Sequence, residues 1–151
     1  MQAVTKNQLW TGRILSGLAV LFLLFDGVTK LMRLPPVVEA TTQLGFPESS
    51  VALLGTLVLV GTVLYVIPRT SVVGAIVLTG FLGGAIAAHV RLGNPLFSHT
   101  LFPSYLAALL WGGLMLRSVR VRALLLSGTS RAAPREDASR SAPALKEARG
   151  Q

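Results

Sequence analysis

The sequence predicts an all-α fold, an integral membrane bundle of four helices with both termini in the cytoplasm. Three observations support this prediction: an apolar composition, four long apolar runs, and an uneven distribution of lysine and arginine around them. The residues AVILMFWYC make up 52% of the 151-residue chain and charged residues only 13%, which is about half the charged share of a soluble domain. So few charges cannot cover the surface of a water-soluble globular protein, and that class is excluded.

Four apolar segments are predicted to be long enough to cross a bilayer, for which a helix needs roughly 20 residues. A spanning segment must satisfy its own backbone hydrogen bonds, and these segments lack the two-residue alternation of a barrel strand, so each is predicted to be a helix. Asp26, Lys30 and Arg33 stand where a signal peptide would have a small-residue cleavage site, so the first helix is predicted to remain as an anchor. The predicted helices cover residues 13–32, 51–67, 71–89 and 101–117, within one transmembrane domain of residues 1–126.

The connections between these helices differ in length. In the first connection, residues 33–50, Pro35 and Pro36 suit the opening of a short helix from Val37 to Leu44, and Gly45 suits its end. The mixture of valines and polar residues in this stretch is typical of a segment that lies at the membrane surface. The second connection is only three residues long, so the helices on either side of it must form an antiparallel hairpin.

Lysine and arginine residues near the helix ends predict the orientation. Seven of them lie on the side of the membrane that holds the N-terminus: Lys6, Arg13, Arg69, Arg117, Arg120, Arg122 and Arg131. Three lie on the opposite side: Lys30, Arg33 and Arg91. Both termini are therefore expected in the cytoplasm, in a multi-pass protein of the cell membrane. Residues 127–151 combine Ser, Ala and Pro with mixed charge and no apolar periodicity, which predicts a disordered basic cytoplasmic tail.

Net charge and cysteine content restrict the partners. The net charge of +8 does not indicate nucleic-acid binding, because the basic residues flank apolar segments and form no patch with interleaved aromatics. Anionic headgroups of the lipid bilayer are the expected partner of this charge. The chain contains no cysteine, so disulfides, iron–sulfur clusters and dithiol motifs are excluded, and a redox role would need a bound cofactor or further subunits.

Asp26 and Lys30 are ionisable residues inside a predicted spanning helix. At a spacing of four residues they share a helix face and are close enough to pair. Charges are costly inside a membrane, which makes both residues candidates for a ligand or proton site. The alternative is a purely structural ion pair, with Lys30 reaching towards the membrane interface.

The segment after the third predicted helix is the densest polar run outside the tail. It contributes four further candidates for a ligand or proton site, His89, Arg91, Asn94 and His99, and the fourth predicted helix adds a fifth, Tyr105. The spacing of the two histidines matches no metal-binding motif, so no metal site is predicted, and the imidazoles are expected to hydrogen-bond at a wet interface or to belong to the ligand site. With the N-terminus inside, all these residues fall in the outer half of the bundle. Asp26 and His89 are therefore predicted to line one outward-facing polar pocket, with Lys30 beside the carboxylate.

Small residues recur every four positions in the third predicted helix, at Gly80, Gly84 and Ala88. Such a strip lets a neighbouring backbone approach closely. It is predicted to be a helix-packing surface, either for another helix of the same chain or for a second copy in a homodimer.

A family resemblance rests on the string GFLGGAIAAHVRLGNPLFSHTLFPSYLAALLWGGLMLR from Gly80 to Arg117, and on FDGVTKLM from Phe25 to Met32. These segments resemble the DoxX-like family of small four-helix integral membrane proteins, and the likeness covers residues 10–126. The resemblance implies a four-helix membrane bundle and an association with quinone-linked oxidation or membrane redox complexes. It supplies no established catalytic set, so the catalytic residues stay unassigned and enzymatic activity stays open.

Three functions fit these observations. The first is a subunit of a quinone-linked membrane redox system, associated with redox-complex subunits, that holds an apolar ligand in the outward-facing polar pocket, with a quinone as the candidate cofactor. The second is a non-enzymatic protein that binds or transports a small molecule or lipid in the same pocket. The third is a structural membrane partner that packs through its glycine strips.

The predicted orientation can be tested with reporters fused after Gln151. We expect a fused fluorescent protein that matures only in the cytoplasm to be bright, and a fused alkaline phosphatase, active only outside, to be silent, because the lysine and arginine bias places the C-terminus inside. Phosphatase activity without fluorescence would contradict the orientation.

Overall fold

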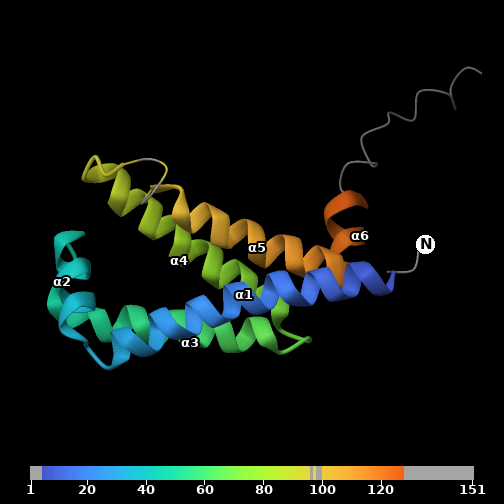
Figure 1. Ribbon diagram of the computed structural model, residues 1–151, viewed down its shortest axis with the longest axis horizontal. Coiled ribbons are helices and arrows are strands. Elements are labelled where there is room, and N and C mark those ends of the chain that lie inside the picture. Colours follow the sequence, from blue (N-terminus) through green and yellow to red (C-terminus); the bar gives the residue numbers. More distant parts are fainter. Residues whose placement is uncertain (1–4, 96, 98–99, 128–151) are drawn as a thin grey trace, which may run out of the picture.

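The computed structural model describes residues 5–95, 97 and 100–127, and all the regular secondary structure in this part of the chain is helix, without strands. The all-α prediction is therefore confirmed (Figure 1). In chain order the elements are α1 (Lys6–Leu31), α2 (Pro35–Gln43), the 3-10 turn η1 (Glu48–Ser50), α3 (Val51–Val66), α4 (Ser71–Arg91), α5 (Phe102–Arg117) and α6 (Val119–Ser127).

Within the described residues, three helices are long and apolar enough to cross a membrane. They are α1 with 26 residues, α3 together with η1 with 19, and α4 with 21. Helix α5 is apolar but has only 16 residues, or about 24 Å at 1.5 Å per residue, against about 30 Å for the hydrocarbon core. By length and composition, three of the four predicted spanning helices are therefore supported. The fourth span, α5, remains a prediction.

The helix bounds agree with the sequence prediction to within two residues, except at the start of the first helix and in the additional helix α6. Helix α1 begins at Lys6, seven residues before the predicted start. The reason is a capping box, in which the backbone N–H of Gln8 donates to Thr5 Oγ1 at 3.4 Å and that of Thr5 donates to Gln8 Oε1 at 3.2 Å. Helix α6 was not predicted at all, and it ends at Ser127, the first residue of the predicted tail. The rest of that tail, residues 128–151, lies outside the described residues.

The connection between α1 and α3 contains the short helix that the sequence predicts. Pro35 and Pro36 occupy the first turn of α2, where a missing N–H costs no hydrogen bond. Gly45 follows the helix with φ +84°, in the left-handed region that glycine adopts without strain. The connection is tied to itself by an ion pair, in which Arg33 Nη2 lies 2.7 Å from Glu48 Oε1.

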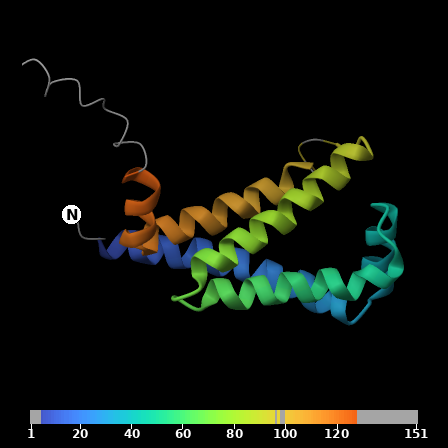
Figure 2. The ribbon, with the colours of Figure 1, turned by 180° about the vertical axis from the view of Figure 1, so that it is seen from behind.

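The four long helices form a closed ring, in which α1 packs against α3 and α5, and α4 packs against the same two helices. Figures 1 and 2 show that the pairs α1–α3 and α4–α5 lie close together at the end that carries α6 and the start of α1. We call this the α6 end. The pairs splay apart towards the opposite end, where α2 stands, which we call the α2 end.

Tyr65 joins three helices in the α6 half of the core. This fully buried side chain of α3 donates from its hydroxyl to the carbonyl oxygen of Leu110 on α5 at 2.7 Å, and its oxygen lies 2.9 Å from Ser16 Oγ on α1. Since the single phenol proton goes to the carbonyl, Ser16 must donate to Tyr65. The guanidinium of Arg117 lies 4.8 Å from the centre of the tyrosine ring, and its Nη2 donates to the Tyr65 carbonyl at 3.2 Å.

Glycines let α1 approach both of its neighbours. A Cβ on Gly113 of α5 would lie 2.4 Å from Ser16 Oγ, and one on Gly12 would lie 2.9 Å from the Gly113 carbonyl. At the crossing with α3, a Cβ on Gly55 would lie 3.0 Å from the carbonyl of Gly27. Small residues at these two crossings bring the backbones into contact, as in other membrane helix pairs.

Replacing Tyr65 by Phe should destabilise the bundle. The change leaves the Leu110 carbonyl without its donor and the Ser16 hydroxyl without its acceptor, and we expect a loss of about 1–3 kcal/mol in the free energy of unfolding. Thermal unfolding in detergent, followed by circular dichroism, measures the effect. Tyr105→Phe is the matched control, because this second tyrosine is 51% exposed. Equal losses in the two variants would show that the buried hydrogen bonds contribute nothing.

Candidate functional site

A cavity of about 800 Å³, partly open to the surroundings, lies between the helices in the α2 half of the bundle. Its volume falls within the range of about 300–1,000 Å³ that is typical of small-molecule sites. All four long helices contribute to the wall, and α2 adds to it. The lining side chains are mostly apolar, and they include Phe22, Leu23, Leu54, Leu57, Phe81, Leu82, Phe102 and Leu106 from the long helices, Val37 and Ala40 from α2, and Leu44 directly after α2.

The predicted packing strip on α4 takes part in this cavity instead of contacting another helix of the described chain. A Cβ on Gly80 or Gly84 would meet no atom within 4 Å, and both glycines line the cavity. Ala88, the third member, is buried. The intrachain packing prediction is therefore wrong for the two glycines, because the helix pairs have already splayed apart at their depth. The homodimer alternative stays a prediction.

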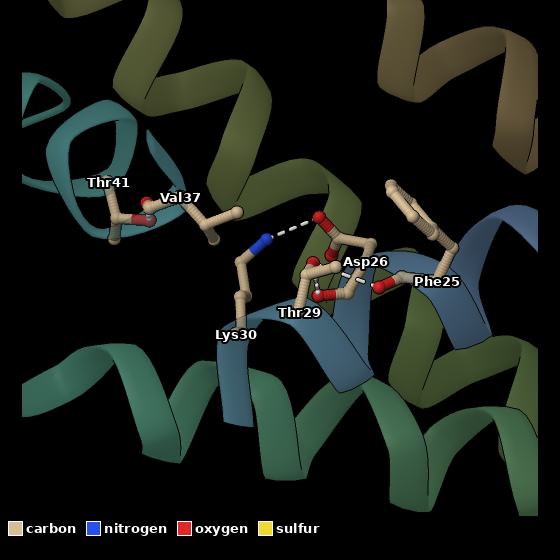
Figure 3. A network of polar contacts seen from close by, with 6 residues as sticks. All are labelled: Phe25, Asp26, Thr29, Lys30, Val37 and Thr41. Atoms are coloured by element: carbon tan, nitrogen blue, oxygen red, sulfur yellow. Dashed lines mark hydrogen bonds and ion pairs between the residues drawn. The ribbon is translucent and has the colours of Figure 1, made fainter. Parts of the chain in front are cut away.

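Asp26 and Lys30 enter the cavity from α1 and form the expected ion pair, in which Lys30 Nζ donates to Asp26 Oδ1. Their side chains are 26% and 13% exposed, respectively. Figure 3 shows the ammonium and the carboxylate turned towards each other, with the Val37 side chain of α2 pointing at the lysine. Thr29 does not join the pair, because its hydroxyl donates to the carbonyls of Phe25 and Asp26 at 2.9 and 3.0 Å.

His89 and Asn94 form a second polar pair on the cavity wall, at the end of α4. Asn94 Nδ2 lies 2.9 Å from His89 Nδ1, and the Asn94 backbone N–H donates to the His89 carbonyl at 3.1 Å. An amide nitrogen only donates, so in this orientation Asn94 Nδ2 donates to His89 Nδ1. The chain can turn back under the histidine because Gly93 has φ +66°.

Arg91 lies at the rim of the site and is not part of the wall. Its Nη2 donates to the carbonyl of Leu44 at 2.9 Å and so ties the end of α4 to the end of α2. A Cβ on Gly45 would lie 2.1 Å from the same nitrogen, so glycine at this position permits the contact. Arg91 therefore holds the α2 end closed on one side of the cavity.

The other two predicted residues do not join this group. Tyr105 is on α5, about half exposed, and does not line the cavity. His99 lies outside the described residues. The structure thus brings four of the predicted candidates to one cavity, namely Asp26, Lys30, His89 and Asn94.

Sequence reasoning missed two parts of the wall. The first is α2, although Val37, Thr41 and Leu44 have the spacing of one helix face, which could have indicated a buried side. The second is the aromatic pair of Phe22 and Phe102, which closes the wall between α1 and α5 with ring centroids 5.1 Å apart in an edge-to-face arrangement. No signal in the sequence pairs these two rings.

The arrangement suits an apolar molecule with a polar head. The apolar side chains can surround a ring or a hydrocarbon chain, and the ammonium, imidazole and amide can donate hydrogen bonds to carbonyl or hydroxyl oxygens. Within the described residues, no three His, Asp or Glu side chains lie close enough together to hold a metal ion.

The sequence also matches a family model. The model of the DoxX-like family covers residues 14–113, about two thirds of the chain, from within α1 to within α5. No curated protein and no solved structure matches the chain.

The energetic role of the ion pair can be measured with a double-mutant cycle. Asp26→Asn leaves the ammonium without its carboxylate, and Lys30→Met leaves the carboxylate without its ammonium. We expect each single change to lower the free energy of unfolding by about 2 kcal/mol, and the double variant to lose clearly less than the sum. Thermal unfolding in detergent gives the three values. Single changes below about 0.5 kcal/mol would show an ion pair as weak as a solvated surface pair.

Proposed function

We propose a function for this chain, which belongs to the DoxX-like family. It is a membrane protein that binds a quinone and acts as a subunit of a membrane redox system. The observation that carries the proposal is the cavity of about 800 Å³ with apolar walls and two polar pairs, Asp26–Lys30 and His89–Asn94. Apolar cavities with a few converging polar groups are the usual form of small-molecule sites.

The proposal includes four spanning helices, with α5 as the fourth. Helix α5 packs between α1 and α4, and a helix of its length crosses a bilayer where the lipid thins or flanking side chains reach the interface. An even number of spans places both ends of the bundle's chain at the α6 end. The lysine and arginine bias assigns that end to the cytoplasm, and the cavity then lies in the outer half of the membrane.

The residues of the cavity fit a quinone. A quinone, when bound, supplies two-electron, two-proton chemistry. Its carbonyl oxygens need hydrogen-bond donors, and the Lys30 ammonium has three N–H groups, of which one is bonded to Asp26. Asp26 pairs with the lysine ammonium, and an imidazole such as that of His89 is a side chain that can accept and release a proton. Because the chain has no cysteine, the electrons come from a further bound cofactor or from a partner subunit.

A second candidate function is the binding or transport of an apolar small molecule or lipid without redox chemistry. It rests on the same cavity and on the absence of cysteine, since binding alone requires no electron path through the chain. The chemical identity of the molecule that copurifies with the protein distinguishes the two candidates.

Filling the cavity should expel the bound molecule. A phenylalanine at position 84 has room for its Cβ and would project into the cavity, so we expect Gly84→Phe to fold and to lose at least about nine tenths of the quinone extracted from the purified protein. Chromatography and mass spectrometry of the organic extract measure the content. Gly83→Phe is the matched control, because Gly83 also has no neighbour within 4 Å of a Cβ but does not line the cavity.

Each result of this experiment has one meaning. Quinone in the wild-type and Gly83→Phe proteins, with none in Gly84→Phe, supports the redox subunit. Another apolar molecule with the same pattern supports the second candidate and contradicts the quinone. Equal quinone in all three proteins contradicts the assignment of the cavity as its site.

A further inference from the structure

The charges of the described residues are divided between the two ends of the bundle. The acidic residues Asp26, Glu39 and Glu48 all belong to the α2 end, where they lie among basic residues. At the α6 end, all the charged residues of the described part are basic. They are Lys6, Arg13, Arg69, Arg117, Arg120 and Arg122. No acid of the described chain offsets this positive charge.

Helix α6 holds its part of this charge in a defined position. It follows α5 after a single residue and turns across the direction of the bundle (Figures 1 and 2). Val121 is buried in the core, the backbone N–H of Val121 donates to Ser118 Oγ at 3.4 Å, and Arg122 Nη2 donates to the Met115 carbonyl at 3.3 Å. A basic helix fixed across the end of a membrane bundle has the position of a helix that lies in the membrane interface.

Three arginines of the α6 end are not used in holding the fold. Arg117 and Arg122 donate to backbone carbonyls. Arg13, Arg69 and Arg120 are exposed, and their side chains make neither a hydrogen bond nor an ion pair with the described residues. They come from α1, from the turn between α3 and α4, and from α6. A guanidinium group in such a position is well suited to a phosphate, which it can bind through two hydrogen bonds.

Apolar side chains beside these arginines indicate the rest of the ligand. Trp10 and Ile14 of α1 flank Arg13 in the sequence, and each is 57% exposed. Tryptophan is enriched at the level of lipid headgroups. Guanidinium groups next to an exposed apolar helix face match a molecule that joins a phosphate to hydrocarbon chains, whereas a nucleic acid or free phosphate would leave this apolar face uncovered.

We propose that the α6 end binds the headgroups of anionic phospholipids in the leaflet that it meets, through Arg13, Arg69 and Arg120. This interaction fixes the depth of the bundle in the membrane. It is independent of the proposed cavity ligand, because the cavity lies in the α2 half.

Quenching of Trp10 fluorescence by brominated lipids tests the proposal. In the full-length chain, Trp111→Phe leaves Trp10 as the sole tryptophan. The protein is reconstituted into vesicles that mix brominated phosphatidylglycerol with phosphatidylcholine, or the reverse, and the two quenching curves give the relative binding constant. We expect phosphatidylglycerol to be preferred at least about fivefold, and Arg69→Gln and Arg120→Gln each to lower this preference about fivefold, since one basic residue near an anionic surface contributes about 1 kcal/mol.

Arg33→Gln is the matched control, because it removes one exposed arginine from the α2 end, where that residue pairs with Glu48. We expect it to leave the preference unchanged. Equal quenching by the two lipids in the parent protein would overturn the proposal, and so would an equal loss in all three variants. The proposal would also be overturned if inorganic phosphate at matched ionic strength abolished the preference for phosphatidylglycerol. That result would identify a phosphate site that does not need the lipid. Circular dichroism shows whether each variant retains its helices.

Discussion

The hydroxyl of Tyr65 is the contact on which the shape of the bundle depends. It joins α3 to α5 and α1 through Leu110 and Ser16, and it lies beside the close crossing of Gly12 and Gly113. In a membrane an unsatisfied polar group costs several kcal/mol, so these bonds hold the helices together at one level. The helices are free to diverge on the other side of this level, and the cavity occupies the space that opens there.

The two halves of the bundle therefore use polar side chains differently. In the α6 half, the polar atoms of Tyr65 and Ser16 satisfy each other and the backbone, which leaves nothing for a ligand. In the α2 half, Asp26 and Lys30 satisfy each other only in part, because an ammonium has three donors and a carboxylate about four acceptor sites. A polar pair with remaining hydrogen-bonding capacity on an apolar wall is what makes this chain, a membrane protein of the DoxX-like family, a candidate for holding a small molecule.

The α2 segment connects the fold with this site. It is fastened to α4 by the contact of Arg91 with the Leu44 carbonyl, and the pair of Arg33 with Glu48 joins the two ends of the connection that contains it. Both contacts are at the α2 end, where the long helices are farthest apart. A short helix held across a splayed bundle by polar contacts gives the cavity a side that the spanning helices alone cannot provide.

The sequence by itself determined the features that depend on neighbouring residues. The apolar runs predicted the long helices, the three-residue link predicted the hairpin of α3 and α4, Pro35 and Gly45 bounded α2, and the spacing of four predicted the pair of Asp26 and Lys30, because each follows from local helix geometry. Only the tertiary structure decided what Gly80 and Gly84 contact, since a strip of small residues suits a helix or a cavity equally well. The role of Tyr65 and the position of α6 were also decided there. Their contacts join residues that are close only after the helices have packed, and no local pattern determines the angle at which helices diverge.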